Sequence, residues 1–193
     1  NGAPPIDQQY FYECVKQGDL APTRNIILQT EFASGIIPTG KGGDFTEQEA
    51  VAIAKQKGRD EAVTQMVYNF TDPALGRNLK TMPQIWYCAD RDHARHVEKL
   101  LNDLHGKDSK SGTYAKMMHG DMKPDERKQI FDDYKAGRIK ALISADLLIE
   151  GYDFPKCELT VMLRPTKSPR ICVQGGARST STDPDNPDKI AYV

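Results

Sequence analysis

Gln174 and Arg178 lie four positions apart in a segment that opens with Ser168 and Pro169. Serine at the N-cap and proline at the first helical position are start signals for a helix. Residues four apart share one helix face, so these two side chains are expected to point the same way. A guanidinium held in this manner can stabilise the charge that develops on a phosphoryl group during hydrolysis. The alternative is a surface arginine on a solvated helix.

A second group of polar residues follows the short apolar run at 140–143, which is predicted to be a buried strand. The loop after it contains Glu150, Gly151 and Asp153 and is punctuated by Pro155. In open α/β sheets, ligands bind at the carboxyl ends of strands. A carboxylate there can accept hydrogen bonds from ribose hydroxyls, and a glycine lets a nucleotide approach the backbone. The alternative is an aspartate that caps its own turn.

Two further strands are predicted, at 85–88 and at 114–118. The first is followed by Arg91 and His93 at the start of a helix, and the second by His119 and Gly120. Amides at a helix N-terminus attract phosphate groups, and arginine adds positive charge, although the acids on either side of Arg91 oppose it. These residues are therefore candidates for contact with a nucleic-acid backbone. The alternatives are a capped, solvated helix start and a hydrogen-bonded loop histidine.

From residue 83 onward, apolar runs of strand length alternate with amphipathic segments of helix length. Helices are predicted at 92–104, at 124–135 and from 169, with further strands at 159–163 and 189–193. Such alternation predicts an α/β fold in which a mostly parallel sheet is flanked by helices. Residues 1–82 are predicted as a mainly helical linker or appendage that packs on the main domain, 83–193. Its helices are expected at 4–18, 46–58 and 60–70, with a strand at 25–29.

One loop in the first 82 residues contains a pattern similar to a phosphate-binding loop. Residues 35–42 supply the glycines and Lys41 of G-x-x-x-x-G-K, but Gly42 replaces the Ser or Thr whose hydroxyl binds magnesium. A phosphate loop must also run directly into a helix. Here the next helix is predicted to begin only at Thr46, with Glu49 completing a capping box. A connecting loop is the preferred interpretation, and a free-standing kinase built on this loop is a further alternative.

Composition limits the classes of protein that this chain can belong to. With 38% hydrophobic and 27% charged residues, the 193-residue chain can bury a core. A formal net charge of −1 excludes a uniformly basic protein that coats nucleic acid, while local basic patches stay possible. No run of 18 apolar residues is present, so no membrane span is expected. The four cysteines form no C-x-x-C pair, which favours buried free thiols in a reducing cytosol over a metal or disulfide set.

Two of these segments resemble motifs of a known family. S-A-D-L-L-I-E-G-Y-D-F-P at 144–155 is similar to motif V of superfamily-two helicases, and V-Q-G-G-A-R-S-T-S at 173–181 is similar to their motif VI. The chain thus resembles DEAD/DEAH-type helicases of bacteria and phages, in the second of their two RecA-like domains. Residues 86–94 resemble motif IV, and His119-Gly120 resembles a segment that lies under the nucleic acid.

The resemblance implies a role for each matching residue. The catalytic residues acting on ATP would be Gln174 and Arg178. The nucleotide-binding residues would be Glu150, Gly151 and Asp153. The residues on the backbone of single-stranded or duplex DNA or RNA would be Arg91, His93, His119, Gly120 and Ser144.

ATP with Mg²⁺ is the implied cofactor, and its metal ligands and phosphate loop would come from an N-terminal RecA-like domain of the same protein. This chain by itself is expected to hydrolyse no appreciable ATP, and a cytoplasmic location in a bacterial or phage-infected cell is expected. The family usually has threonine at position 145, glycine at 177 and arginine at 181, where this chain has Ala145, Ala177 and Ser181. A degenerate RecA-like domain that binds protein or nucleic acid without hydrolysis is therefore the alternative.

Overall fold

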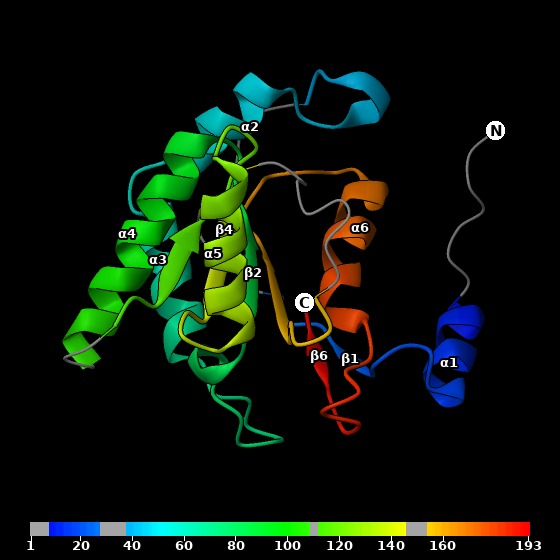
Figure 1. The fold of residues 1–193 in the computed structure, drawn as a ribbon. Helices are drawn as coiled ribbons and strands as arrows, with labels where there is room; N and C mark the ends of the chain where they lie inside the picture. Colours follow the sequence, from blue (N-terminus) through cyan, green and yellow to red (C-terminus); the bar gives the residue numbers. More distant parts are fainter. Residues whose placement is uncertain (1–7, 28–37, 109–111, 146–153) are drawn as a thin grey trace.

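The computed structural model describes residues 8–27, 38–108, 112–145 and 154–193 (Figure 1). The motif V residues Glu150, Gly151 and Asp153 lie outside these ranges. In the described part, six strands form one sheet with the order β1-β6-β5-β2-β4-β3. The strands are β1 (Thr23–Arg24), β2 (Gln84–Tyr87), β3 (Ala115–Met117), β4 (Ala141–Ser144), β5 (Leu159–Met162) and β6 (Ala191–Tyr192).

Each pairing between these strands is parallel. Every residue of the inner strands β2 and β4 is buried. Parallel strands that are covered on both faces are apolar along their whole length rather than in alternation, which is the pattern of the runs at 85–88 and 140–143. The predicted α/β fold with a mostly parallel sheet flanked by helices is confirmed.

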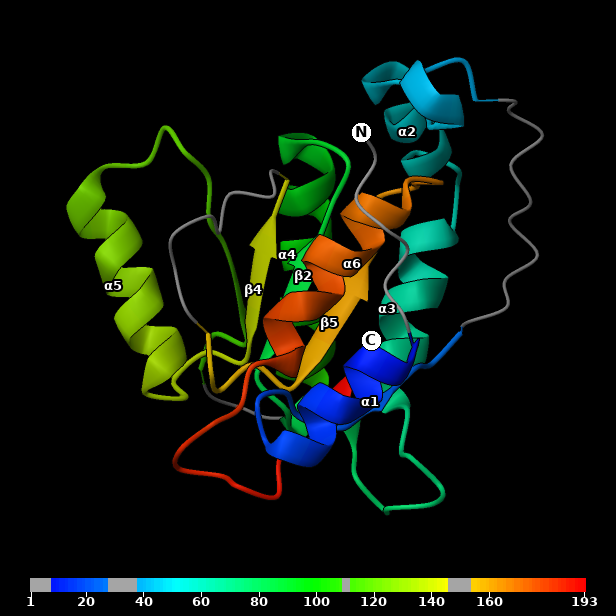
Figure 2. The ribbon, with the colours of Figure 1, turned by 90° about the vertical axis from the view of Figure 1, so that its right-hand side faces the viewer.

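Helices cover both faces of the sheet. They are α1 (Gln8–Gln17), α2 (Glu47–Ala54), α3 (Arg59–Asn69), α4 (Arg91–Asp108), α5 (Pro124–Lys135) and α6 (Pro169–Thr180), with 3₁₀ turns at Lys41–Gly43 and Leu79–Thr81. Side chains of α3 and α4 pack with Trp86 on one face. Side chains of α5 pack with Ile85, which points to the opposite face because successive strand residues alternate. Figure 2 shows α6 in front of the strands and α4 behind them.

The predicted strands at the β1–β6 edge differ most from the structure. Of the strand predicted at 25–29, residues 28 and 29 lie outside the described ranges. The strand found in this segment is Thr23–Arg24, and Ile27 is 87% exposed. Its partner β6 is short, so the backbone pairing of the two segments ends at the hydrogen bond from the Ile26 N–H to the Val193 carbonyl, at 2.8 Å. The strand predicted at 189–193 is reduced to Ala191–Tyr192 because Lys189 closes a turn, its N–H donating to the Asn186 carbonyl at 3.1 Å.

Contacts cross the predicted domain boundary at residue 82. β1 pairs with β6 in the same sheet. The buried carboxylate of Asp72 lies 2.7 Å from Arg24 Nε and accepts a hydrogen bond from the Tyr192 hydroxyl at 3.0 Å. The first 82 residues therefore contribute both a strand and side chains to the sheet that the rest of the chain builds. The division at residue 82 stays a prediction.

The loop at 38–46 connects without entering a helix directly. Residues 41–43 form a 3₁₀ turn, residues 44–46 are extended, and α2 begins only after Thr46. The predicted capping box is present, since the Thr46 side chain accepts from the Glu49 N–H and the Glu49 carboxylate accepts from the Thr46 N–H. This geometry supports the connecting-loop interpretation for the described positions, while residues 35–37 lie outside them.

Candidate functional site

The carboxyl ends of the three central strands lie level with one another. Tyr87 of β2 stands opposite Ser144 of β4 on one side and Met162 of β5 on the other. Backbone hydrogen bonds continue past these residues, because the Cys88 N–H donates to the Ser144 carbonyl at 2.8 Å and the Leu163 N–H to the Tyr87 carbonyl at 2.9 Å. The loops that leave these strands therefore start from one edge of the sheet, where a ligand of an α/β fold is expected.

At this edge the structure brings the start of α4 close to the loop after β3. Arg91 Nη1 lies 2.5 Å from Asp121 Oδ2, and this pairing, together with its hydrogen bond, lowers the pKa of Asp121. The Arg91 side chain is 47% exposed. His119 is half-buried and Gly120 is exposed in the same loop. Three of the predicted nucleic-acid contacts, Arg91, His119 and Gly120, are thus gathered on one side of the site.

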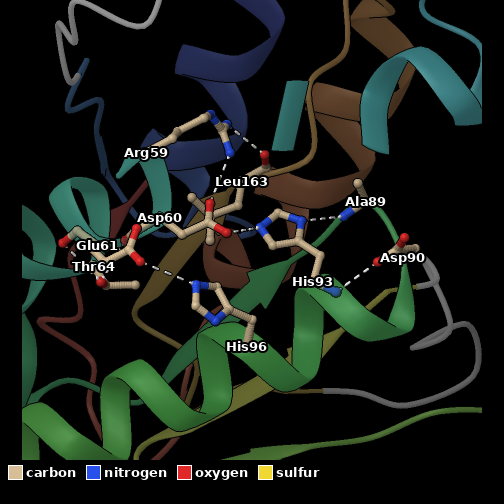
Figure 3. A network of polar contacts seen from close by, with 9 residues as sticks. All are labelled: Arg59, Asp60, Glu61, Thr64, Ala89, Asp90, His93, His96 and Leu163. Carbon is tan, nitrogen blue, oxygen red and sulfur yellow. Dashed lines mark hydrogen bonds and ion pairs between the residues drawn. The ribbon is translucent and has the colours of Figure 1, made fainter. Parts of the chain in front are cut away.

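His93 and Ser144, the other two predicted nucleic-acid contacts, are buried. The His93 side chain is 1% exposed and Ser144 is 1% exposed. His93 Nδ1 accepts a hydrogen bond from the Ala89 N–H at 3.0 Å, and the His93 N–H donates to Asp90 Oδ1 at 2.7 Å (Figure 3). In this conformation neither side chain is accessible at the surface.

Helix α6 carries the two predicted catalytic residues one turn apart. Gly175 faces the sheet so closely that a Cβ atom there would collide with Met162 and contact Tyr87. Gln174 is exposed and Arg178 is half-buried. Burial raises the pKa of Tyr87 to about 12, and the nearby Arg178 guanidinium opposes that rise by its charge and a side-chain hydrogen bond. The Arg178 guanidinium therefore rests beside the Tyr87 hydroxyl.

The loop that leads from β5 into α6 is held by residues of the first 82. Arg59 Nη2 donates to the Leu163 carbonyl at 2.9 Å. Asp44 accepts from the Thr166 hydroxyl at 2.8 Å and from the Lys167 N–H at 2.6 Å. Burial alone would raise the pKa of Asp44, but these hydrogen bonds outweigh it and the pKa is lowered.

Sequence reasoning did not single out Asp44, Arg59 or Asp60. The glycine at position 58 marks the start of a helix, and it indeed adopts a left-handed conformation with φ 81°. Nothing local to it identifies Leu163, which lies 104 positions away, as the partner of Arg59. Ser168 occupies the predicted N-cap of α6, but its side chain makes no capping hydrogen bond. Tertiary contacts, rather than the cap, position the start of this helix.

The described residues contain no group of three metal-binding side chains. Cys88 and Cys157 are buried free thiols, Cys14 is half-buried and Cys172 is exposed. Among the described helices, none is both long enough and apolar enough to cross a membrane.

Known proteins resemble this chain in sequence and in fold. The family described as "Helicase conserved C-terminal domain" matches residues 62–180. A 51.5 kDa protein of a Lactococcus phage is 42% identical over 66 residues, and the ATP-dependent RNA helicase DBP5 of Saccharomyces cerevisiae is 36% identical over 65 residues. The UvrABC system protein B of Chlorobium chlorochromatii is 34% identical over 71 residues. These matches cover 33%, 34% and 37% of this chain but only 15%, 14% and 10% of the relatives.

Two solved structures share the fold over almost the whole chain. A fragment of a putative HsdR subunit of a type I restriction enzyme from Vibrio vulnificus has a TM-score of 0.71 at 18% identity, and covers 98% of this chain and 37% of that one. The type ISP restriction-modification enzyme LlaBIII bound to DNA has a TM-score of 0.58 at 13% identity, with coverages of 94% and 12%. The family match includes both α4 and the helix that carries Gln174 and Arg178. Because that match spans more than half of the chain, the chain belongs to the helicase conserved C-terminal domain family and has the RecA-like fold of superfamily-two helicases.

Proposed function

We propose that this domain supplies one half of the ATP site of a nucleic-acid-dependent ATPase. The observation that carries the proposal is helix α6, which lies inside the family match and carries the exposed Gln174 and the half-buried Arg178 one turn apart. The other half, with the phosphate loop, would come from an N-terminal RecA-like domain of the same protein. Closure of the cleft between the two domains would bring Arg178 to the phosphates.

The residues present suit a phosphate better than a metal ion. The arginine on α6 is the kind of donor that binds phosphoryl oxygens, whereas the described residues offer no set of three metal ligands. Bound ATP would supply the phosphoryl group, and its Mg²⁺ would neutralise part of the charge of that group. The positive charge of Arg178 would stabilise the negative charge that develops on the leaving group in the transition state. It would therefore lower the barrier to hydrolysis more than it strengthens ATP binding. Glu150, Gly151 and Asp153 are proposed to hold the nucleotide.

The nucleic-acid backbone is proposed to lie across the start of α4 and the loop after β3. Arg91 supplies charge there, while His119 and Gly120 form the neighbouring surface. His93 and Ser144 support this surface from behind. The relatives named above include an RNA helicase and the UvrABC system protein B, so the proposal covers both DNA and RNA.

Replacing Arg178 tests the proposed role in hydrolysis. In the full-length protein, Arg178→Ala is expected to lower the rate of ATP hydrolysis by about 10³-fold or more, because arginines that contact the transferring phosphate contribute on that scale. ATP affinity, measured with a fluorescent ATP analogue, is expected to change far less. Equal losses of hydrolysis and of affinity would contradict the proposal, as would full activity of the variant.

A non-catalytic binding module is the second candidate, and one observation favours it. The position of the second motif VI arginine is occupied by Ser181, the C-cap of α6, whose carbonyl accepts from Lys189 Nζ at 2.6 Å. Lys189 is 2% exposed and cannot replace that arginine at the surface. Nucleic-acid binding by the full-length protein without any ATP hydrolysis would identify this second candidate.

A further inference from the structure

Two adjacent side chains at the start of α3 are linked to the ends of two different strands, Arg59 directly and Asp60 through His93. Arg59 Nη2 donates to the Leu163 carbonyl at the end of β5, at 2.9 Å. Arg59 Nη1 also lies 3.1 Å from Asp60 Oδ1, and Asp60 Oδ2 lies 3.1 Å from His93 Nε2. His93 in turn holds the loop after β2. Figure 3 shows this chain of contacts, which we call the buried network and define as Arg59, Asp60 and His93.

The buried network has one consistent arrangement of protons. His93 Nδ1 accepts from the Ala89 N–H at 3.0 Å, so the ring proton belongs on Nε2, which faces Asp60. Nε2 lies 3.1 Å from Asp60 Oδ2 but lacks good hydrogen-bond geometry. The Ala89 N–H thus has its hydrogen-bond acceptor in His93, and the Nε2 side of the ring faces the carboxylate that also pairs with Arg59.

Burial makes this arrangement sensitive to the loss of any member. The side chains of Arg59, Asp60 and His93 are 14%, 6% and 1% exposed. Removing one partner of a buried charged pair leaves the other charge without compensation, which is strongly unfavourable. The helix start adds to the effect, because the N-terminal dipole of α3 favours the Asp60 carboxylate. The two strand ends are therefore expected to keep a fixed relative position.

The two loops held in this way lead to the two functional regions of the domain. The loop after β2 leads to Arg91, at the proposed nucleic-acid surface. The loop after β5 leads to α6, which carries Gln174 and Arg178. We infer that Arg59 and Asp60 are positioning residues, which fix the nucleic-acid loop relative to the helix that carries the catalytic arginine. Through them, nucleic acid bound at the first loop sets the position of Arg178. This inference rests on the proposed function.

Asp60→Asn in the full-length protein tests the inference. Asparagine keeps the shape of the side chain but removes the negative charge between Arg59 and His93. The stimulation of ATP hydrolysis by single-stranded DNA or RNA oligonucleotides is expected to fall by about tenfold, a typical coupling between two sites. Hydrolysis without nucleic acid and affinity for a fluorescent ATP analogue are expected to stay within about twofold of the unmodified protein.

Glu61→Gln is the matched control. It removes one negative charge from the same helix turn, but the Glu61 side chain is 47% exposed and lies 3.6 Å from the half-exposed His96 (Figure 3). This variant is expected to keep its full stimulation by nucleic acid. Full stimulation of Asp60→Asn, or an equal loss in Glu61→Gln, would overturn the inference.

Amide hydrogen exchange separates this inference from the proposed function. Asp60→Asn is expected to increase exchange both at 89–92 and at 163–168, and Glu61→Gln at neither. An increase in only one of the two loops would overturn the inference even if the protein hydrolyses ATP as proposed. If nucleic acid does not stimulate ATP hydrolysis by the unmodified protein, the proposed function fails. Amide exchange alone then decides whether the buried network holds the two loops together.

Arg59→Lys provides a second variant in case Asp60→Asn does not fold. Lysine keeps the positive charge beside Asp60, but a single ammonium lacks the planar fork that contacts Asp60 and the Leu163 carbonyl together. Exchange is expected to increase at 163–168 while 89–92 stays protected through Asp60 and His93, and stimulation is again expected to fall. Unchanged exchange at 163–168 would overturn the inference.

Discussion

At the scale of single residues, Arg91, the proposed nucleic-acid contact at the start of α4, is half-exposed and paired with an acid. Its ion pair with Asp121 joins two side chains that are 47% and 70% exposed. Ion pairs this exposed contribute little to stability, so the pair with Asp121 orients the Arg91 guanidinium only weakly. A phosphate group could therefore compete with Asp121 for the guanidinium at small cost.

We predict that Arg91→Ala weakens nucleic-acid binding with little effect on folding. Loss of one phosphate contact should reduce the slope of log affinity against log salt concentration by about 1. Arg95→Ala is the control, because Arg95 is exposed on the next turn of α4 and pairs with Asp92 at 2.7 Å. Titrations of the full-length protein with fluorescent oligonucleotides at several salt concentrations would measure both slopes. Identical slopes for the two variants would contradict the surface proposed here.

At the scale of single elements, α6 lies close against the sheet. Its two adjacent glycines differ in their surroundings. A Cβ at Gly175 would collide with Met162, whereas a Cβ at Gly176 would lie 3.4 Å from the nearest atom of Val193. The closeness at Gly175 brings α6 against Tyr87 and Met162, and so fixes the depth at which Gln174 and Arg178 are presented.

Alanine at these two positions should differ in its effect on stability. Gly176→Ala is expected to stabilise the fold by about 0.5–1 kcal/mol, because alanine favours helix and the space is sufficient. Gly175→Ala is expected to gain less, because the Cε atom at the end of the flexible Met162 side chain must move to make room. Urea unfolding followed by fluorescence of Trp86, the single tryptophan and fully buried, would measure both. Equal effects of the two substitutions would show that α6 can shift away from the sheet.

The capping box of α2 predicts a particular dependence of stability on pH. The hydrogen bond from the Thr39 hydroxyl at 2.7 Å, followed by those from Thr46 and the Thr39 N–H, lowers the pKa of Glu49 from 4.5 to about 2. A carboxyl group with a lower pKa in the folded state stabilises the protein above its unfolded pKa and loses that effect as pH falls. The contribution of Glu49 is thus complete above pH 4.5 and lost between there and about pH 2.

Glu49→Gln should therefore destabilise the protein at neutral pH but not near pH 2. The difference in urea midpoint between the variant and the unmodified protein, followed from neutral to acid pH, is the measurement. Glu47→Gln, in the exposed first turn of the same helix, serves as the control. Its difference in urea midpoint from the unmodified protein should not shrink toward acid pH. A difference that persists unchanged to pH 2 would contradict the assigned hydrogen bonds.

At the scale of the whole molecule, the proposed function requires a second domain for catalysis. Its described residues contain no set of metal ligands, and its glycine-rich loop at 38–46 is not followed directly by a helix. We predict that the isolated chain hydrolyses no appreciable ATP, because the described part of its glycine-rich loop does not run directly into a helix as a phosphate loop must. Phosphate release in the presence of ATP, Mg²⁺ and nucleic acid would measure this. Magnesium-dependent turnover by the isolated chain would contradict the prediction.

Local patterns were sufficient for the elements around the site. Strand-length apolar runs and helix-length amphipathic segments predicted the parallel sheet, and Pro124 and Lys135 were predicted as the ends of α5, where the structure has them. The spacing of Thr46 and Glu49 predicted a capping box that the structure contains. These features follow from interactions between residues a few positions apart, so the sequence alone carries them.

The tertiary structure decided which residues hold those elements together. The position of β1 was set by its partner β6, at the other end of the chain, and the predicted strand was wrong by two residues at its start. His93 reads as a candidate contact at a helix start, yet folding buries it between Ala89 and Asp60. Arg59 meets Leu163 across 104 positions. Burial and long-range pairing depend on how the whole chain packs, and no local period or motif encodes them.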